Sequence, residues 1–445
     1  MKAIGIDIGT TNISGVVWDQ TEGKMLVSKM VSSDCFLSGG PEWERTQDVS
    51  VILSKARTLL DELLTDWPEV KTIGLTGQMH GILYLNAKGE AVSPLYTWQD
   101  GRGDQRQENG LSLVEQIRQK QQLPVATGYG LVTHIYNKIH NLVPESAVSI
   151  CTIMDYVGMA LTGREKPLIH ASNGASLGFF DGENLRFQEE KLKEWGVDCS
   201  VLPELASDGK VLGYYQGRLI TVALGDNQAG FLGAAGMEPG TALVNMGTGG
   251  QISLLSDKYV EAPGIEARPF MAGQYLLVGA SLCGGRAYAI LEGFLRSYAV
   301  AAGAKDQSQY EVMARLAEKA EGEMLARLGD VTQPAEVLLV NTTFQGTRQD
   351  PALRGSILNI SDDNFTPEHL IYGVLEGMAQ ELYGFYETMC QSGMCDINRL
   401  VGSGNGLRMN PVLQRIFERK FRKELELADC QEEAACGAAI WAKRN

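Results

Sequence analysis

The chain opens with the stretch Ala3-Ile4-Gly5-Ile6-Asp7-Ile8-Gly9-Thr10-Thr11-Asn12. An apolar run leads into Asp7, a glycine and two hydroxyl residues follow, and another apolar run comes after them. This pattern predicts a strand, a tight turn and a second strand. Gly9 is expected to adopt a positive φ and to let the backbone approach a ligand closely. The amides and hydroxyls of Thr10 and Thr11, with the Asp7 carboxylate, suit half of a phosphate site with a hydrated Mg²⁺.

The same pattern returns near the middle of the chain, in Ala242-Leu243-Val244-Asn245-Met246-Gly247-Thr248-Gly249. One glycine–threonine turn is usually only a hairpin, but two copies at equivalent places favour a two-sided phosphate clamp. No glycine-rich loop carries the lysine of a P-loop, so amides, hydroxyls and a metal are expected to hold the phosphate. The repeat predicts two α/β domains of the same kind, 1–233 and 234–445, with the boundary near 230–240.

Bulk composition excludes several classes of partner. The 445 residues exceed one ordinary core, and a net charge of −15 disfavours nucleic acid and anionic membrane surfaces. Asp7 interrupts the first apolar run, so we expect no signal peptide. No later apolar run reaches the ~18 residues that a membrane-spanning helix needs. The eight cysteines are scattered without a CxxC pair, so we expect reduced thiols in a cytoplasmic protein.

Apolar spacing predicts the main elements of secondary structure. Short joins between runs at 2–8, 13–18 and 25–31 predict an antiparallel meander. A helical stripe begins at Val49 and ends before Pro68. Thr366-Pro367-Glu368 is a typical helix start, with a capping hydroxyl, a proline and an acid. Further elements are expected as a strand at 71–75, a polar helix at 105–120 and a strand at 221–224.

Six motifs in family order carry a resemblance that spans the whole chain. They are Gly5-Ile6-Asp7-Ile8-Gly9-Thr10-Thr11, Thr76-Gly77-Gln78-Met79-His80-Gly81, Trp98-Gln99-Asp100-Gly101-Arg102, Gly225-Asp226-Asn227-Gln228-Ala229-Gly230, Asn245-Met246-Gly247-Thr248-Gly249 and Gly402-Ser403-Gly404-Asn405-Gly406. Together they resemble the FGGY carbohydrate kinases of the actin/hexokinase/Hsp70 ATPase superfamily. The resemblance implies an α/β fold of two actin-like (ribonuclease H-like) domains around a central cleft.

Within that family the motifs look most like those of sedoheptulokinases and xylulokinases. Gln78-Met79-His80 and the segment Gly346-Thr347-Arg348-Gln349-Asp350-Pro351 carry this similarity. Segment 133–138 departs from the family's lysine–tryptophan signature. The resemblance implies ATP-dependent transfer of the γ-phosphate to a terminal hydroxyl of a ketose, with sedoheptulose or xylulose favoured.

The first domain is expected to bind the sugar and to supply the catalytic base. The resemblance places the base at Asp226, although an aspartate after a strand and a glycine is often only a turn residue. Trp98 suits stacking on a sugar ring, and Asp100 suits vicinal hydroxyls, although Asp100 and Arg102 are alternatively an exposed ion pair. The expected sugar contacts are Gln78, Met79, His80, Trp98, Asp100, Arg102 and Asn227, with Asn173 a weaker candidate.

The second domain is expected to hold most of the ATP, with Asp7 holding Mg²⁺ through water. The expected nucleotide contacts are Gly9, Thr10, Thr11, Gly247, Thr248, Gly249, Gly284, Gly285, Gly402, Ser403, Gly404 and Asn405. The charged residues of segment 346–351 either border the nucleotide or form a surface pair. Asn410 is expected only to cap the helix that follows it.

Several other functions compete with this interpretation. One is a kinase for another pentulose or hexulose. An actin-like ATPase acting as a chaperone or filament, and a sugar-binding regulator without activity, are readings from other classes. The expected partner is a small-molecule sugar, without nucleic acid or membrane, and the resemblance implies a possible homodimer.

Overall fold

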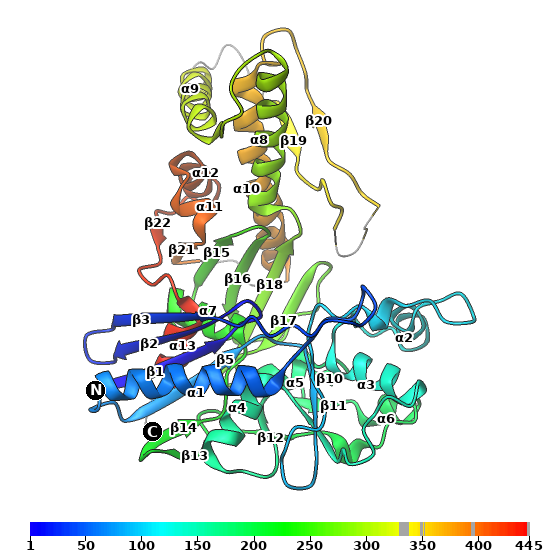
Figure 1. The fold of residues 1–445 in the computed structure, drawn as a ribbon. Helices are drawn as coiled ribbons and strands as arrows, with labels where there is room; N and C mark the ends of the chain where they lie inside the picture. Colours follow the sequence, from blue (N-terminus) through cyan, green and yellow to red (C-terminus); the bar gives the residue numbers. More distant parts are fainter. Residues whose placement is uncertain (329–337, 348–349, 351, 393–396, 443–445) are drawn as a thin grey trace. The chain divides into compact units, whose positions relative to one another are not determined.

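The computed structural model describes residues 1–328, 338–347, 350, 352–392 and 397–442. The chain divides into two compact units (Figure 1). Unit 1 contains Met1–Gly236, Arg268–Gln274 and Cys430–Asn445, and unit 2 contains Met237–Ala267 and Tyr275–Asp429. Arg348, Gln349 and Pro351 of the motif at 346–351, and Cys395, lie outside the described residues.

Unit 1 is built on a six-stranded sheet of order β13-β14-β5-β1-β2-β3. Its strands are β1 (Lys2–Ile8), β2 (Asn12–Asp19), β3 (Lys24–Ser32), β5 (Thr72–Gly77), β13 (Val211–Tyr215) and β14 (Arg218–Thr221). β1, β2 and β3 form an antiparallel meander, which confirms the prediction from the short joins between them. β5 runs parallel to both β1 and β14, so its carboxyl end lies beside that of β1.

Unit 2 repeats this topology in a six-stranded sheet of order β17-β18-β16-β15-β21-β22. Its strands are β15 (Thr241–Met246), β16 (Gly250–Ser256), β17 (Ile265–Pro269), β18 (Tyr275–Ser281), β21 (Arg399–Ser403) and β22 (Leu425–Leu427). β15, β16 and β18 form the antiparallel meander, and β15, β21 and β22 run parallel. The repeat in the sequence therefore corresponds to a repeat of the sheet.

Two helices cover opposite faces of the unit 1 sheet. Helix α1 (Val49–Asp66) buries the predicted apolar stripe and ends at Trp67, directly before Pro68. Its Leu63 side chain meets the face of the sheet on which Gly15 lies. On the opposite face, a Cβ on Gly5 would stand 1.8 Å from the Ala435 carbonyl oxygen, so α13 (Glu433–Trp441) lies directly on β1.

The position of α13 explains why unit 1 includes the end of the chain. Its buried residues occur all around the helix rather than on one stripe, and it packs against β1, β5 and helix α7 (Asp226–Ala235). The repeat alone had indicated a single boundary near 230–240. Cys430 and Cys436, at the start of α13, form a disulfide in the structure, which corrects the expectation that all the cysteines are reduced.

The remaining elements of unit 1 lie mostly between β5 and β13 in sequence. Helix α2 begins only at Leu113, because Ser112 and Glu115 form a capping box there, and the predicted helix at 105–120 therefore starts too early. The other helices are α3 (Gly130–Ile139), α4 (Ile153–Thr162), α5 (Ala171–Ser176) and α6 (Glu189–Lys193), with α2 spanning Leu113–Gln121. The short strands are β4 (Thr46–Gln47), β6 (Leu83–Leu85), β7 (Leu95–Tyr96), β8 (Ser149–Cys151), β9 (Leu168–His170), β10 (Phe180–Asp181), β11 (Arg186–Phe187) and β12 (Glu204–Ala206).

Long helices pack on the sheet of unit 2. Helix α10 (Pro367–Gln391) begins after its N-cap Thr366, as predicted, and packs against β16 and β18. The others are α8 (Gly284–Ala301), α9 (Tyr310–Leu328), α11 (Asn405–Arg408) and α12 (Pro411–Phe421), and a short hairpin joins β19 (Leu339–Asn341) to β20 (Ser356–Leu358). Across the described ranges, no helix combines the length and apolarity needed to cross a membrane.

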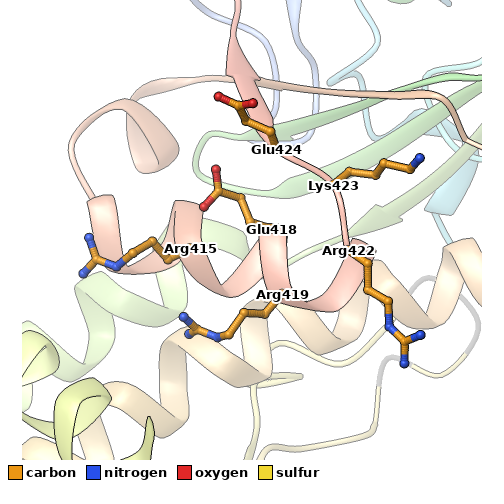
Figure 2. A pocket seen from close by; sticks show the side chains of 6 residues that line it. All are labelled: Arg415, Glu418, Arg419, Arg422, Lys423 and Glu424. Carbon is orange, nitrogen blue, oxygen red and sulfur yellow. The ribbon is translucent and has the colours of Figure 1, made fainter.

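A charged hollow lies where α12 turns toward β22, but its side chains do not converge. Arg415 and Arg419 extend to one side of α12, whereas Arg422 and Lys423 extend elsewhere (Figure 2). Arg415 and Arg419 both donate to the buried carboxylate of Glu321 in α9. These arginines therefore join α12 to α9.

Candidate functional site

The first turn of the chain joins β1 to β2, as predicted, but its glycine is needed for a different reason. The φ of Gly9 lies outside the left-handed region. A Cβ on Gly9 would stand 2.8 Å from the carbonyl oxygen of Asn12, which no real side chain tolerates. Close approach within the turn, rather than a positive φ, therefore requires glycine here.

A ring of hydrogen bonds joins the turn to residues from three other segments. Thr10 Oγ1 donates to Gln78 Oε1 at 3.1 Å and accepts from Trp98 Nε1 at 2.9 Å. Gln78 Nε2 donates to Gln47 Oε1 at 2.8 Å, and Gln47 Nε2 donates to the Thr10 carbonyl at 2.8 Å. The structure thus brings an expected phosphate residue together with two expected sugar residues. Gln47, in β4, completes the ring without any signal in the sequence.

Trp98 and Gln78, two members of this ring of hydrogen bonds, differ in their exposure to solvent. Trp98 is 46% exposed, whereas Gln78 is 4% exposed. The indole of Trp98 therefore offers an open face, and its NH fixes the orientation of the ring against Thr10. Gln78 mainly holds the turn in place, because both ends of its amide already bond to protein groups.

Asp100 and Arg102, expected to contact sugar or alternatively to form an exposed ion pair, form an ion pair that is buried. Their side chains are 0% and 1% exposed, and Arg102 Nε donates to Asp100 Oδ1 at 2.6 Å. Arg102 also bonds to Asn137 and Glu44, and its guanidinium lies 4.3 Å from the centre of the Tyr96 ring. The two residues are thus a buried ion pair behind Trp98 that fixes the loop carrying it.

His80 is held in a strained conformation at the end of the β5 loop. Its φ is +74°, a region that costs a residue other than glycine about 1 to 3 kcal/mol. The backbone N of His80 donates to Ser176 Oγ, and Nδ1 lies 2.7 Å from the Ser176 carbonyl. Because a carbonyl only accepts, Nδ1 carries a hydrogen. The ring also stacks on Tyr129 at 4.5 Å.

Asp226 is the first residue of α7, directly after the N-cap Gly225. Asn227 Nδ2 donates to Asp226 Oδ1 at 2.6 Å and lies 3.8 Å from the sulfur of Met79. The structure therefore brings the expected base, Asn227 and Met79 together. The N-terminus of a helix also favours a negative charge at this position.

Burial and nearby charge raise the pKa values of two carboxyl groups in unit 1. Burial, then the negative charges of Asp226 and Glu432, raise the pKa of Asp7 to about 7. Burial also raises the pKa of Asp226, while the Asn227 hydrogen bond and the positive charge of Arg268 oppose this. Asp7, near the end of β1, and Asp226, the first residue of α7, thus interact electrostatically.

This pair of carboxyl groups suits a hydrated magnesium ion. In the part of the chain that the structure describes, no three His, Cys, Asp or Glu side chains form a metal cage. Mg²⁺ does not require one, because it binds through one or two carboxylates together with waters and substrate phosphates. A cation beside Asp7 would offset the cost of two buried negative charges.

Asn173 lies beneath this region. Its Nδ2 donates to Asp155 Oδ2 at 2.9 Å and to the Ala223 carbonyl at 3.2 Å. Asn173 is fully buried. It therefore supports the chain that leads to Asp226.

In unit 2 the second glycine–threonine turn adjoins the start of α8. Gly285 N donates to the Gly247 carbonyl at 2.9 Å, and Arg286 N donates to the Thr248 carbonyl at 3.0 Å. Thr248 itself is exposed. No side chain among the described residues caps α8, because the turn itself accepts from the first amides of the helix. The exposed turn around Thr248 is thereby held against the start of α8.

The third glycine loop lies beside the second turn because β21 runs parallel to β15. Ser403 pairs with Asn245, whose Nδ2 donates to Ser403 Oγ at 2.7 Å. Gly404 has φ +84°, and a Cβ there would stand 2.5 Å from the Met246 carbonyl oxygen. Asn405 is exposed, whereas Gly402 and Ser403 are buried. The expected nucleotide residues of unit 2 therefore gather at one end of its sheet, with Gly402 and Ser403 supporting the loop.

Asn410 has the role expected of it. Its side chain accepts from Leu413 N at 3.1 Å and caps α12.

Comparisons with known proteins agree with this arrangement. Residues 2–236 match the model for the FGGY family of carbohydrate kinases, N-terminal domain, and residues 242–445 match its C-terminal domain. The chain is 28% identical over 481 residues to sedoheptulokinase of Mus musculus, covering 98% of this chain and 96% of that protein. It is 24% identical over 461 residues to xylulose kinase of Lactococcus lactis, covering 98% and 86%.

A solved structure shows the same fold. The crystal structure of xylulose kinase from Rhodospirillum rubrum superposes with a TM-score of 0.84 at 21% identity, covering 99% of this chain and 89% of that one. The family resemblance and the two-domain α/β fold predicted from the sequence are confirmed. The chain belongs to the FGGY family of carbohydrate kinases, and its reaction is phosphoryl transfer to a sugar.

Proposed function

We propose that this kinase transfers the γ-phosphate of ATP to a terminal hydroxyl of a ketose, and that Asp226 accepts the proton of that hydroxyl. The observation that carries the proposal is the contact of Asn227 with both Asp226 and Met79. This contact places the Asp226 carboxylate near the segment Gln78-Met79-His80, which is expected to bind the sugar. Phosphoryl transfer needs one positioned carboxylate of this kind, because most of the catalysis is alignment and charge neutralisation.

The environment of Asp226 makes its carboxylate more basic than that of an ordinary aspartate, as a general base requires. Burial raises its pKa above that of an ordinary aspartate, so the carboxylate binds a proton more readily. The Asn227 hydrogen bond, the Arg268 charge and the α7 N-terminus keep the charged form accessible. The same carboxyl group can therefore take a proton and release it afterwards.

We further propose that the sugar rests against Trp98, with His80 among the residues that contact it. The open face of Trp98 supports stacking on the C–H face of a sugar. Gln78 then contributes indirectly by holding the turn at Thr10, and the Asp100–Arg102 pair by holding the loop that carries Trp98. Ketoses are favoured as acceptors because the relatives described above are named sedoheptulokinase and xylulose kinase.

The nucleotide is proposed to lie against the glycine loops of unit 2. The exposed turn around Thr248 suits its phosphates, and Gly404 and Asn405 offer backbone to its adenosine. Gly9, Thr10 and Thr11 of unit 1 remain predicted phosphate contacts. Asp7 would hold Mg²⁺ through water, and the bound ion would neutralise charge on the phosphates. A cytoplasmic location and a homodimer are kept as predictions from the family resemblance.

The proposal is tested by ADP release with a panel of acceptors. We expect release that depends on sedoheptulose or xylulose, with ribulose and fructose as related ketoses and glycerol as a non-ketose control. If the enzyme prefers another pentulose or hexulose, the proposed acceptor is wrong, but the proposed reaction stands. ATP hydrolysis at the same rate without any sugar would contradict the proposal and favour an actin-like ATPase.

A further inference from the structure

A short segment that runs from the last two residues of β17 to the residue before β18 belongs to unit 1. This segment, Arg268–Gln274, is called the arm below. The Pro269 carbonyl accepts from Gln228 Nε2 at 2.8 Å, and the Phe270 ring packs edge-on against Phe231 with centroids 6.0 Å apart. Gln228 and Phe231 both belong to α7, the helix that Asp226 begins. The arm is therefore attached to the helix that carries the proposed base.

The arm has a defined conformation of its own. Phe270 N donates to the Gln274 carbonyl at 2.9 Å, and Gln274 N donates to the Met271 carbonyl at 3.0 Å. Phe270 and Met271 are 3% and 8% exposed. The tip turns through Ala272 at φ +55° and Gly273 at φ +74°. A buried, hydrogen-bonded turn of this kind can fix the position of the residues that flank it.

A second attachment runs from the tip of the arm through Asp208. Ala272 N donates to Asp208 Oδ2 at 2.5 Å, and His170 Nε2 lies 2.9 Å from Asp208 Oδ1. Burial disfavours the charged form of Asp208, but the hydrogen bonds from His170 and Ala272 outweigh it and lower the pKa of Asp208. The carboxylate is thus charged and accepts from both the arm and the imidazole.

His170 continues this connection to the residue before Asp226. Ser172 N donates to His170 Nδ1 at 3.2 Å, and Ser172 Oγ lies 2.8 Å from the same atom. Since the amide can only donate, Nδ1 accepts, and Nε2 carries the hydrogen given to Asp208. Ser172 Oγ in turn accepts from Gly225 N at 3.0 Å. Asp208, His170 and Ser172, the Asp208 chain, therefore connect the arm to the N-cap of α7.

Arg268 directly precedes Pro269, whose carbonyl accepts from Gln228, and Gln228 lies two residues after Asp226 in α7. The positive charge of Arg268 accordingly acts to lower the pKa of Asp226. Asp226 and Glu432 both act on Asp7, so negative groups dominate these surroundings. The approach of a γ-phosphoryl group would add more negative charge. A guanidinium is suited to balance it, because its charge is permanent and its donors match phosphoryl oxygens.

We propose that the arm is a positioning device for phosphoryl transfer. It holds the start of α7, where Asp226 lies, through Gln228 and the Asp208 chain, and it keeps the charge of Arg268 near this end of the helix. Arg268 then balances the charge that builds up as the phosphoryl group approaches the carboxylate. This inference rests on the proposed role of Asp226 as the base. Asp208 and His170 are positioning residues, because they affect Asp226 only through the arm and through Gly225, the N-cap of α7.

The test combines two single variants with their double variant. Arg268→Gln removes the charge, Asp208→Ala releases the tip of the arm, and Arg268→Lys keeps the charge without the planar fork. Arg218→Gln is the matched control, because Arg218 in β14 donates only to the backbone carbonyls of Gln216 and Pro68 among the bonds the structure shows for it. kcat and KM are measured with sedoheptulose and ATP, after thermal unfolding confirms that each variant is folded.

We expect R268Q to lower kcat at least about tenfold with little change in the KM for sugar, because it removes a charge needed mainly in the transition state. R268K should retain more activity than R268Q. D208A should lower kcat by less. The double variant should lose less than the two single losses combined, because part of the D208A effect is displacement of the same charge that R268Q removes. R218Q should behave as the wild type.

Wild-type kcat in both R268Q and D208A would overturn the inference, and so would effects that add fully in the double variant. If R268Q does not fold, D208A and R268K replace it in the test, and wild-type kcat in both of them would overturn the inference. Asp226→Asn separates this inference from the proposed function. High activity in D226N removes the proposed base, whereas an inactive D226N with normal arm variants removes the arm inference alone.

Discussion

Replacing Asp7 by asparagine should stabilise the metal-free protein while abolishing its activity. Burial, with the charges of Asp226 and Glu432, raises the pKa of Asp7 from its ordinary 3.8 to about 7. The folded state therefore holds a proton that the unfolded chain has released between these two pH values. Stability falls as the pH rises through this window and levels off above about pH 7.

The magnitude follows from the width of the window. A rise from 3.8 to about 7 spans about three pH units, and each is worth about 1.4 kcal/mol, so the charge costs about 4 kcal/mol at pH 8. Asparagine has the shape of the carboxyl group without its charge. D7N should therefore recover most of this free energy at pH 8 and none of it below about pH 4.

Urea unfolding in EDTA, followed by circular dichroism at pH 8 and pH 4, measures this difference. Asp19→Asn is the matched control in the neighbouring strand. Hydrogen bonds from the backbone of Thr21 and Glu22 lower the pKa of Asp19, so D19N should lose stability at pH 8 rather than gain it. A D7N variant that is less stable than the wild type at pH 8, or equally changed at both pH values, would refute the reasoning.

Other predictions concern the sugar site and the loop behind it. Trp98→Ala should raise the KM for sugar about fivefold to tenfold, as expected for the loss of roughly 1 kcal/mol of stacking. Trp98→Phe, which keeps a ring but loses the bond to Thr10, should fall between W98A and the wild type, and equal KM values for all three would exclude stacking. Arg102→Met should destabilise the protein by about 3 to 5 kcal/mol in thermal unfolding, because Asp100 is left buried and charged without its partner. An unchanged Tm would show that the pair does not support the loop.

The repeated turns could be predicted because their signals are local. Hydrophobic alternation that stops at a glycine indicates a strand and turn wherever it occurs, and two copies indicate the repeat. The stripe from Val49 and the cap at Thr366 were predictable for the same reason. The capping box at Ser112 is equally local and explains why helix α2 begins later than its polar composition indicated.

The features that could not be predicted depend on contacts between distant segments. Helix α13 is apolar on all sides, and nothing in its own sequence says which sheet it covers. Gln47 joins the Thr10 ring only because β4 and the loop after β5 meet in space. The position of the arm likewise depends on its hydrogen bonds to Asp208 and to Gln228 of α7. The sequence predicted sugar contacts for Asp100 and Arg102, with an exposed ion pair as the alternative, and could not show that the pair is buried.

The central claim is that Asp226 is the base of phosphoryl transfer, and turnover of Asp226→Asn tests it most directly. Sugar-dependent ADP release and ATP binding are measured side by side for D226N and the wild type at saturating sedoheptulose. Asparagine preserves shape and hydrogen bonding but cannot take the proton. We predict a loss of kcat of about 10² to 10⁴ with ATP binding retained. Turnover close to that of the wild type would contradict the account.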